Sequence, residues 1–224
     1  MEKYFDTLKR CPLFAQIEAE SLGKLLACLG AAVRSFSKGE FIFSAGDAIS
    51  SVGVVLSGGV HVLQEDYWGH RTILAFVAPA QLFGEAFSCA EAESLPVSVQ
   101  AAEDSEILLV DYSRITTTCP SACGFHSRLI QNMMRILAQK NILLTQKIEI
   151  VTHRTIRERL LAYLSAQAVA VGTSHFTIPF DRQELADYLA VDRSAMSAEL
   201  TKMRAEGLIW TSRSAFELRG GDIR

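Results

Sequence analysis

The chain has 224 residues, of which 49% are hydrophobic and 21% charged, so it can bury a sizeable core in one or two domains. No apolar run reaches the ~18 residues of a membrane-spanning helix. The charged segment Met1–Arg10 lacks the apolar stretch of a signal peptide. Five cysteines at irregular spacing argue against a secreted disulfide framework. We therefore expect a cytoplasmic protein with no membrane partner.

The formal net charge of -3 is unevenly divided along the chain. Residues 1–151 carry 12 Lys and Arg against 16 Asp and Glu, whereas residues 152–224 carry 10 against 9. The C-terminal part is therefore marginally basic. Any nucleic-acid binding there must depend on where individual cationic side chains point, because the bulk charge is too small to attract a polyanion.

Short strands separated by turn residues are predicted between about residues 32 and 111. Gly or Pro lies between most of them, and this regular spacing is typical of an antiparallel sandwich or barrel. The expected strands are 41–43, 52–56, 60–63, 72–76, 97–100 and 107–110.

A long helix is predicted next, from Pro120 at its first helical position to about Val151. Its apolar residues follow the 3.5-residue period of a coiled-coil seam, with Asn141 as the polar exception. A lone Asn at such a position fixes the register of a parallel two-stranded coil, so we favour a homodimer over a single helix buried in a monomer's core. The predicted dimer seam is Ile130, Met134, Leu137, Asn141, Leu144 and Ile148. A second stripe is expected to contact the barrel: Leu129, Met133, Ile136 and Leu143.

Three potential metal ligands or redox groups, Cys119, Cys123 and His126, share one face at the start of this helix. A metal site would need a fourth ligand, and a disulfide would need suitable geometry. We favour the simpler interpretation that small thiols fill the joint between barrel and helix, and we expect no metal. The sequence does not decide whether these residues have a redox or metal role.

The C-terminal part predicts a winged helix-turn-helix. Asp181 is followed three residues later by Glu184, which is the pattern of a capping box, and Asp192 is a second N-cap. The second helix is expected to end at Gly207. A helix through residues 156–164 and a strand-like stretch at 176–180 precede this pair, and a hairpin over 208–218 follows it.

The second helix of the pair carries exposed cationic and hydroxyl side chains at its N-terminal end, the end that enters the major groove in such motifs. Arg193, Ser194 and Ser197 are candidates for reading base edges. The remaining candidates are better placed for phosphates. From spacing alone, all of them could instead be solvated surface residues. The candidate DNA-binding residues are Arg182, Gln183, Arg193, Ser194, Ser197, Thr201, Lys202 and Arg213.

The run Asp181–Ser197 resembles the helix-turn-helix of the CRP/FNR family of bacterial regulators, and Leu200–Ile209 matches the end of that motif. Upstream segments are similar to the family's sensory β-roll, in the expected order. These segments are Lys38-Gly39-Glu40, Ala45-Gly46-Asp47, Leu56-Ser57-Gly58-Gly59-Val60 and Phe83-Gly84-Glu85.

The resemblance implies an α+β protein with three parts. Residues 1–118 would form a jelly-roll β-roll like that of cyclic-nucleotide-binding domains, with flanking helices. Residues 119–151 would form the dimerisation helix, and residues 152–224 the winged helix-turn-helix. The resemblance also implies a homodimer on two-fold symmetric double-stranded DNA that recruits or blocks RNA polymerase.

In the family's cyclic-nucleotide-binding members, a Gly-Glu pair is followed ten residues after the Glu by an Arg that neutralises the cyclic phosphate. Gly84 and Glu85 match the pair, but Leu95 stands in the place of the Arg. A buried phosphate without a cation is unfavourable, so we do not expect cyclic AMP to bind. Glu85 could equally be a structural carboxylate. The candidate effector pocket is Phe83, Gly84, Glu85, Leu95 and Ser98.

Other cofactors of the family find no support in the residues. Cys11 is the one cysteine near the N-terminus, which is too few for an iron–sulfur cluster, and neither His61 nor His70 stands in a haem motif. We expect no cofactor and no catalytic residue, because no nucleophile and base form a recognisable motif. The predicted function is DNA-binding regulation controlled by an unidentified small-molecule or redox signal. The alternative is a small-molecule-binding module whose helix-turn-helix contacts proteins.

Overall fold

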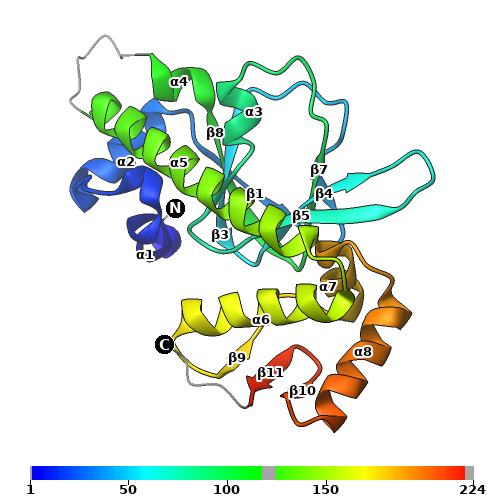
Figure 1. Cartoon of the computed structure of the whole chain (residues 1–224). Coiled ribbons are helices and arrows are strands. Elements are labelled where there is room, and N and C mark those ends of the chain that lie inside the picture. The colour runs from blue at the N-terminus through cyan, green and yellow to red at the C-terminus, as the bar shows by residue number, and fades with distance from the viewer. Residues whose placement is uncertain (1, 118–124, 220–224) are drawn as a thin grey trace. The chain divides into compact units, whose positions relative to one another are not determined.

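The computed structural model describes residues 2–117 and 125–219, which divide into two compact units (Figure 1). The first unit comprises the residues up to His70 together with Leu74–Asn141. The second comprises Arg71–Ile73 and the residues from Ile142 onward. Among the described residues, no helix is both long and apolar enough to cross a membrane.

The first unit is a roll of two antiparallel four-stranded sheets, in the orders β1-β8-β3-β6 and β2-β7-β4-β5. All six strands expected from the sequence are present within one or two residues of their predicted bounds. The strands are β1 (Ala32–Phe36), β2 (Phe41–Phe43), β3 (Ser51–Ser57), β4 (Val60–Glu65), β5 (Arg71–Val77), β6 (Leu82–Phe83), β7 (Ser98–Ala101) and β8 (Ser105–Asp111).

Short helices accompany the roll. They are η1 (Glu2–Tyr4), α1 (Phe5–Arg10), η2 (Pro12–Phe14), α2 (Ala19–Cys28), α3 (Glu85–Cys89) and α4 (Tyr112–Thr116). The N-terminal helices share a core with β3 and β8, in which Leu8, Leu29 and Leu108 are fully buried. This apolar cluster anchors the N-terminal segment to one sheet.

The predicted long helix is α5 (Phe125–Thr152), and the expected start at Pro120 lies outside the described residues. Leu129, Met133 and Ile136 are buried in the core of the first unit, as predicted for the second stripe. The fourth residue of that stripe, Leu143, belongs to the second unit, so its expected contact with the barrel stays a prediction. The buried Asn132 amide donates hydrogen bonds to the carbonyl oxygens of Leu13 and Ala15, both at 2.9 Å.

The second unit contains a winged helix-turn-helix. Its elements are α6 (Ile156–Val171), β9 (His175–Thr177), α7 (Arg182–Leu189), α8 (Arg193–Ala205), β10 (Ile209–Ser212) and β11 (Ala215–Leu218). The strands form one sheet in the order β10-β11-β9. The strand predicted over residues 176–180 is shorter than expected. Leu185, Met196 and Phe216 are buried in the core of this unit.

Candidate nucleic-acid interface

Both helices of the helix-turn-helix begin at the predicted caps. Asp181 Oδ1 accepts a hydrogen bond from the Glu184 backbone N–H at 2.9 Å, and Glu184 Oε2 accepts one from the Asp181 N–H at 2.8 Å. This reciprocal pair is a capping box that satisfies two otherwise unpaired amides. Asp192 caps α8 by accepting from the Ala195 N–H at 2.8 Å. The start of each helix is therefore fixed by local hydrogen bonds.

The turn between the helices depends on Ala190, which has φ 53° and ψ 54° and so lies in the left-handed region. Arg159 Nη1 donates to the carbonyl oxygens of Leu189 and Ala190, each at 3.0 Å, and its Nε donates to the His153 carbonyl at 2.9 Å. A cation at a helix C-terminus also interacts favourably with the helix dipole. Arg159 thus ties the end of α7 to the segment that precedes α6.

Arg193 and Ser194 are exposed in the first turn of α8. The opposite side of α8 is buried through Met196, Leu200 and Met203, so the helix is fixed by its apolar face. In helix-turn-helix proteins the N-terminal end of this helix reaches the base edges. The geometry places the guanidinium and hydroxyl candidates at that end.

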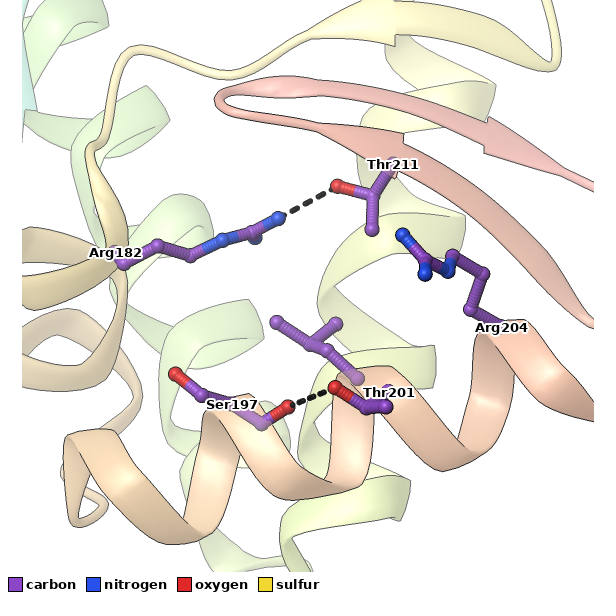
Figure 2. Close-up of a pocket in the computed structure, with 6 residues that line it drawn as sticks. Arg182, Ser197, Thr201, Arg204 and Thr211 are labelled. Carbon is purple, nitrogen blue, oxygen red and sulfur yellow. Dashed lines mark hydrogen bonds between the residues drawn. The ribbon is translucent and has the colours of Figure 1, made fainter.

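A cavity of about 210 Å³ lies between the start of α7, the middle of α8 and β10 (Figure 2). Three predicted residues line it, namely Arg182, Ser197 and Thr201, together with Leu200. Sequence reasoning missed two further polar residues of the lining, Arg204 and Thr211. Both residues are distant from Arg182 in the sequence, so no local pattern linked them to this site.

Arg182 is held rigidly at this cavity. Its Nη2 donates to Thr211 Oγ1 at 2.7 Å (Figure 2). Its guanidinium carbon lies 5.0 Å from the centroid of the Phe216 ring. Burial lowers the pKa of Arg182 from its ordinary value, but a guanidinium remains charged at neutral pH. Two guanidiniums and three hydroxyls around one cavity suit an anion with several acceptor oxygens, such as a phosphate.

The remaining predicted DNA contacts lie outside the lining of this cavity. The Gln183 amide donates to Asp187 Oδ1 at 2.8 Å, and Lys202 is exposed with its Nζ 3.9 Å from Glu199 Oε2. Arg213 is exposed in the turn between β10 and β11, with φ 51°. A non-glycine residue rarely adopts this conformation, so the wing turn carries backbone strain at Arg213.

Sequence reasoning also missed an ion-pair cluster between α6 and α8. Arg157 Nε lies 2.5 Å from Glu199 Oε1, and its two terminal nitrogens lie 2.7 and 2.8 Å from the carboxylate oxygens of Glu206. These hydrogen bonds raise the pKa of Arg157, and the pKa of Glu206 is lowered by the same contact. Arg157 therefore neutralises acidic groups on the helix that would face a polyanion.

On the roll, the candidate effector residues are mostly buried. Phe83 belongs to a core cluster with Val55 and Ile107, and Leu95 is also buried. The Ser98 hydroxyl accepts from the Ala45 N–H at 2.9 Å. Gly84 has φ 80° and is the N-cap of α3, whose first residue is Glu85. The Glu85 carboxylate pairs with Lys140 of α5, a residue that sequence reasoning missed.

The predicted dimer seam leaves its apolar side chains in solvent in the single chain. Met134 is 66% exposed and Ile148 is 60% exposed, with Ile130, Asn141 and Leu144 also exposed and Leu137 half-buried. Large apolar side chains in a row on one helix are unfavourable in water and mark an interaction surface.

Of the three grouped Cys and His residues, Cys119 and Cys123 lie outside the described residues. His126 is buried at the start of α5. Within residues 2–117 and 125–219, no group of three or more His, Cys, Asp or Glu side chains could hold a metal ion.

Two family models match the chain. A cyclic nucleotide-binding domain matches residues 33–120 and a Crp-like helix-turn-helix domain matches residues 158–219. The chain is 28% identical to the transcriptional activator protein FnrA of Stutzerimonas stutzeri over 196 residues, covering 85% of this chain and 75% of the relative. It is 25% identical to the cyclic AMP receptor protein of Thermus thermophilus, covering 95% of this chain and 94% of the relative.

Solved structures have the same fold. The c-di-GMP responsive global regulator CLP of Xanthomonas campestris superimposes with a TM-score of 0.75 at 19% identity, covering 91% of this chain and 100% of that one. The similarity therefore extends over the roll, the long helix and the winged helix-turn-helix together.

Proposed function

Because the chain belongs to the CRP/FNR family of transcription regulators, we propose that it is a homodimer that binds a specific DNA sequence and thereby regulates transcription. The observation that carries this proposal is the exposed N-terminal end of α8, where Arg193 and Ser194 follow a fixed cap. The anion-suited cavity beside it supports a second kind of contact, to the DNA backbone. RNA polymerase is the partner that such a protein would recruit or block. A protein with this role works where the chromosome lies, in the cytoplasm.

Arg193 and Lys202 are assigned different roles in this proposal. If Arg193 donates two hydrogen bonds to guanine, Arg193→Ala should weaken binding by ~1–3 kcal/mol per half-site, mostly at one base position. If Lys202 contacts phosphate, Lys202→Ala should weaken binding to all sequences similarly and reduce the salt dependence of binding.

A randomised duplex library tests these roles, with selection by the wild type and both variants at two salt concentrations. Arg135→Ala is the matched control, because Arg135 is an exposed arginine on α5 rather than on the helix-turn-helix. Equal, sequence-independent losses for Arg193→Ala and Lys202→Ala would show that Arg193 contacts backbone alone. Enrichment of no sequence by the wild type would instead favour a helix-turn-helix that contacts proteins.

The dimeric state is proposed from the exposed seam on α5. Pairing two copies through this seam would bury its apolar side chains and bring the two Asn141 side chains together. Two-fold symmetry would then place two half-sites about 34 Å apart on the DNA. Sedimentation equilibrium should give a dimer at micromolar concentration, and a monomer there would refute the proposed seam.

We further propose that cyclic AMP is not the signal. Leu95, which is buried, stands where the resemblance expects the phosphate-binding arginine of the family's cyclic-nucleotide-binding members, and Glu85 already pairs with Lys140. Titration calorimetry should therefore give a dissociation constant of about 1 mM or weaker for cyclic AMP. A micromolar constant would overturn this part of the proposal.

A further inference from the structure

A buried ion pair joins the roll to the long helix within the first unit. Lys140 Nζ lies 2.6 Å from Glu85 Oε1 and donates a second hydrogen bond, also at 2.6 Å, to the carbonyl oxygen of Leu82. The Glu85 side chain is 3% exposed and that of Lys140 is 33% exposed. The second carboxylate oxygen of Glu85 is buried and has no hydrogen-bond partner among the described residues. The carboxylate therefore depends on Lys140 for its charge compensation.

The position of the ion pair on α5 lets it attach the helix to the roll. Toward the N-terminus, Leu129, Met133 and Ile136 hold the helix to the roll by apolar burial. Lys140 extends this attachment by one further helical turn. Lys140 is followed by Asn141, the last residue of α5 that belongs to the first unit.

The roll side of the pair is equally fixed. Leu82 lies in β6 and Glu85 begins α3, and Gly84 between them has φ 80°. A Cβ atom at Gly84 would lie 2.9 Å from the Ile49 side chain, so a side chain does not fit at this turn without a shift of its neighbours. Lys140 thus binds one corner of the roll through two acceptors.

We propose that the Glu85–Lys140 pair locks α5 to the roll and that DNA binding depends on this lock, so that a signal that separates the pair weakens DNA binding. Lys140 directly precedes Asn141 of the predicted seam, so a helix fixed at Lys140 is also fixed where it would meet its partner. The inference rests on the proposed DNA-binding function for its regulatory half, whereas the structural half can be tested without DNA.

The structural half is tested by a double-mutant cycle on the full chain, with urea unfolding as the readout. Lys140→Met leaves a buried carboxylate without a cation, and because Lys140 is partly exposed we expect the lower end of such effects, about a 100-fold fall in the folding equilibrium constant. Glu85→Gln in the Lys140→Met background should recover at least ~10-fold of this, because no charge then remains buried. Arg135→Met, an exposed site on the same helix, is the control. A loss for Lys140→Met no larger than for Arg135→Met, or no recovery in the double variant, would overturn the lock.

The regulatory half is tested with a duplex that the wild type selects from the random library. Lys140→Met should bind this duplex at least ~10-fold more weakly than the wild type, within the range of typical coupling between sites, and the double variant should bind closer to wild type. Binding by Lys140→Met as tight as by the wild type would overturn the regulatory half. If the wild type selects no DNA sequence, the proposed function is wrong. The unfolding cycle still tests whether the Glu85–Lys140 pair fixes α5 to the roll.

Discussion

Replacing Ala190 with glycine should stabilise the helix-turn-helix, because Ala190 lies at φ 53° and ψ 54°. An L-residue other than glycine is disfavoured in this left-handed region by about 1–2 kcal/mol. Glycine makes the unfolded chain more flexible, which offsets about 0.4–1 kcal/mol of that gain. We therefore expect Ala190→Gly to raise the free energy of unfolding by about 0.5–1 kcal/mol. DNA binding should be unchanged, since Arg159 contacts backbone carbonyls that glycine retains.

The same substitution at Ala166 is the matched control, because Ala166 is exposed inside α6. Glycine in an exposed helix interior is destabilising by about 1 kcal/mol, so the two variants should shift in opposite directions. Urea unfolding can be followed through Trp210 in β10, using a Trp68→Phe background that removes the chain's other tryptophan. With a typical urea dependence, the midpoint should rise by about 0.3–0.5 M for Ala190→Gly. A fall comparable to that of Ala166→Gly would mean that residue 190 is not left-handed and would refute the reasoning.

Three further outcomes are expected. Asn141→Leu should make the dimer more stable but less uniform in register or stoichiometry, because an Asn buried in a dimer seam lowers stability while it specifies the pairing. Sedimentation velocity measures this change. The same single species and the same dimer affinity as for the wild type would contradict the seam. Arg213→Gly should relieve the left-handed φ of 51° in the wing turn and so raise the free energy of unfolding. The same variant should weaken binding to all DNA sequences, because it removes a proposed phosphate contact. Unchanged DNA binding would exclude that contact. Burial raises the pKa of the Cys11 thiol to about 12, so Cys11 stays protonated at pH 8 and should resist alkylation that labels the exposed Cys28. Equal labelling of Cys11 and Cys28 in the native protein, read by mass spectrometry, would contradict that burial.

Features that depend on neighbouring residues could be predicted from the sequence. The caps at Asp181 and Asp192 are hydrogen bonds across three residues, so the identities of a few adjacent side chains are sufficient to predict them. The roll strands and the stripe Leu129, Met133 and Ile136 follow from hydrophobic periodicity in the same way. Leu143, the fourth residue of the stripe, lies in the second unit, so its contact with the barrel stays a prediction.

Contacts between distant residues were not predictable. Glu85 and Lys140 are separated by 54 intervening residues, and nothing in either local sequence indicates the other. Arg204 and Thr211 reach the cavity beside Arg182 because α8 and β10 are brought together by the core, which the one-dimensional pattern does not describe. The same holds for Arg157 and its two acidic partners on α8.

The ion pairs of Arg157 connect α6 to α8 within the second unit and affect how these two helices can move. Glu199 and Glu206 lie seven residues apart, so the Arg157 guanidinium contacts α8 at two points along the helix. Contacts at two points of α8 favour movement of α6 and α8 as one body. A rotation at the start of α6 would then change the orientation of α8 while leaving the contacts between the two helices in place.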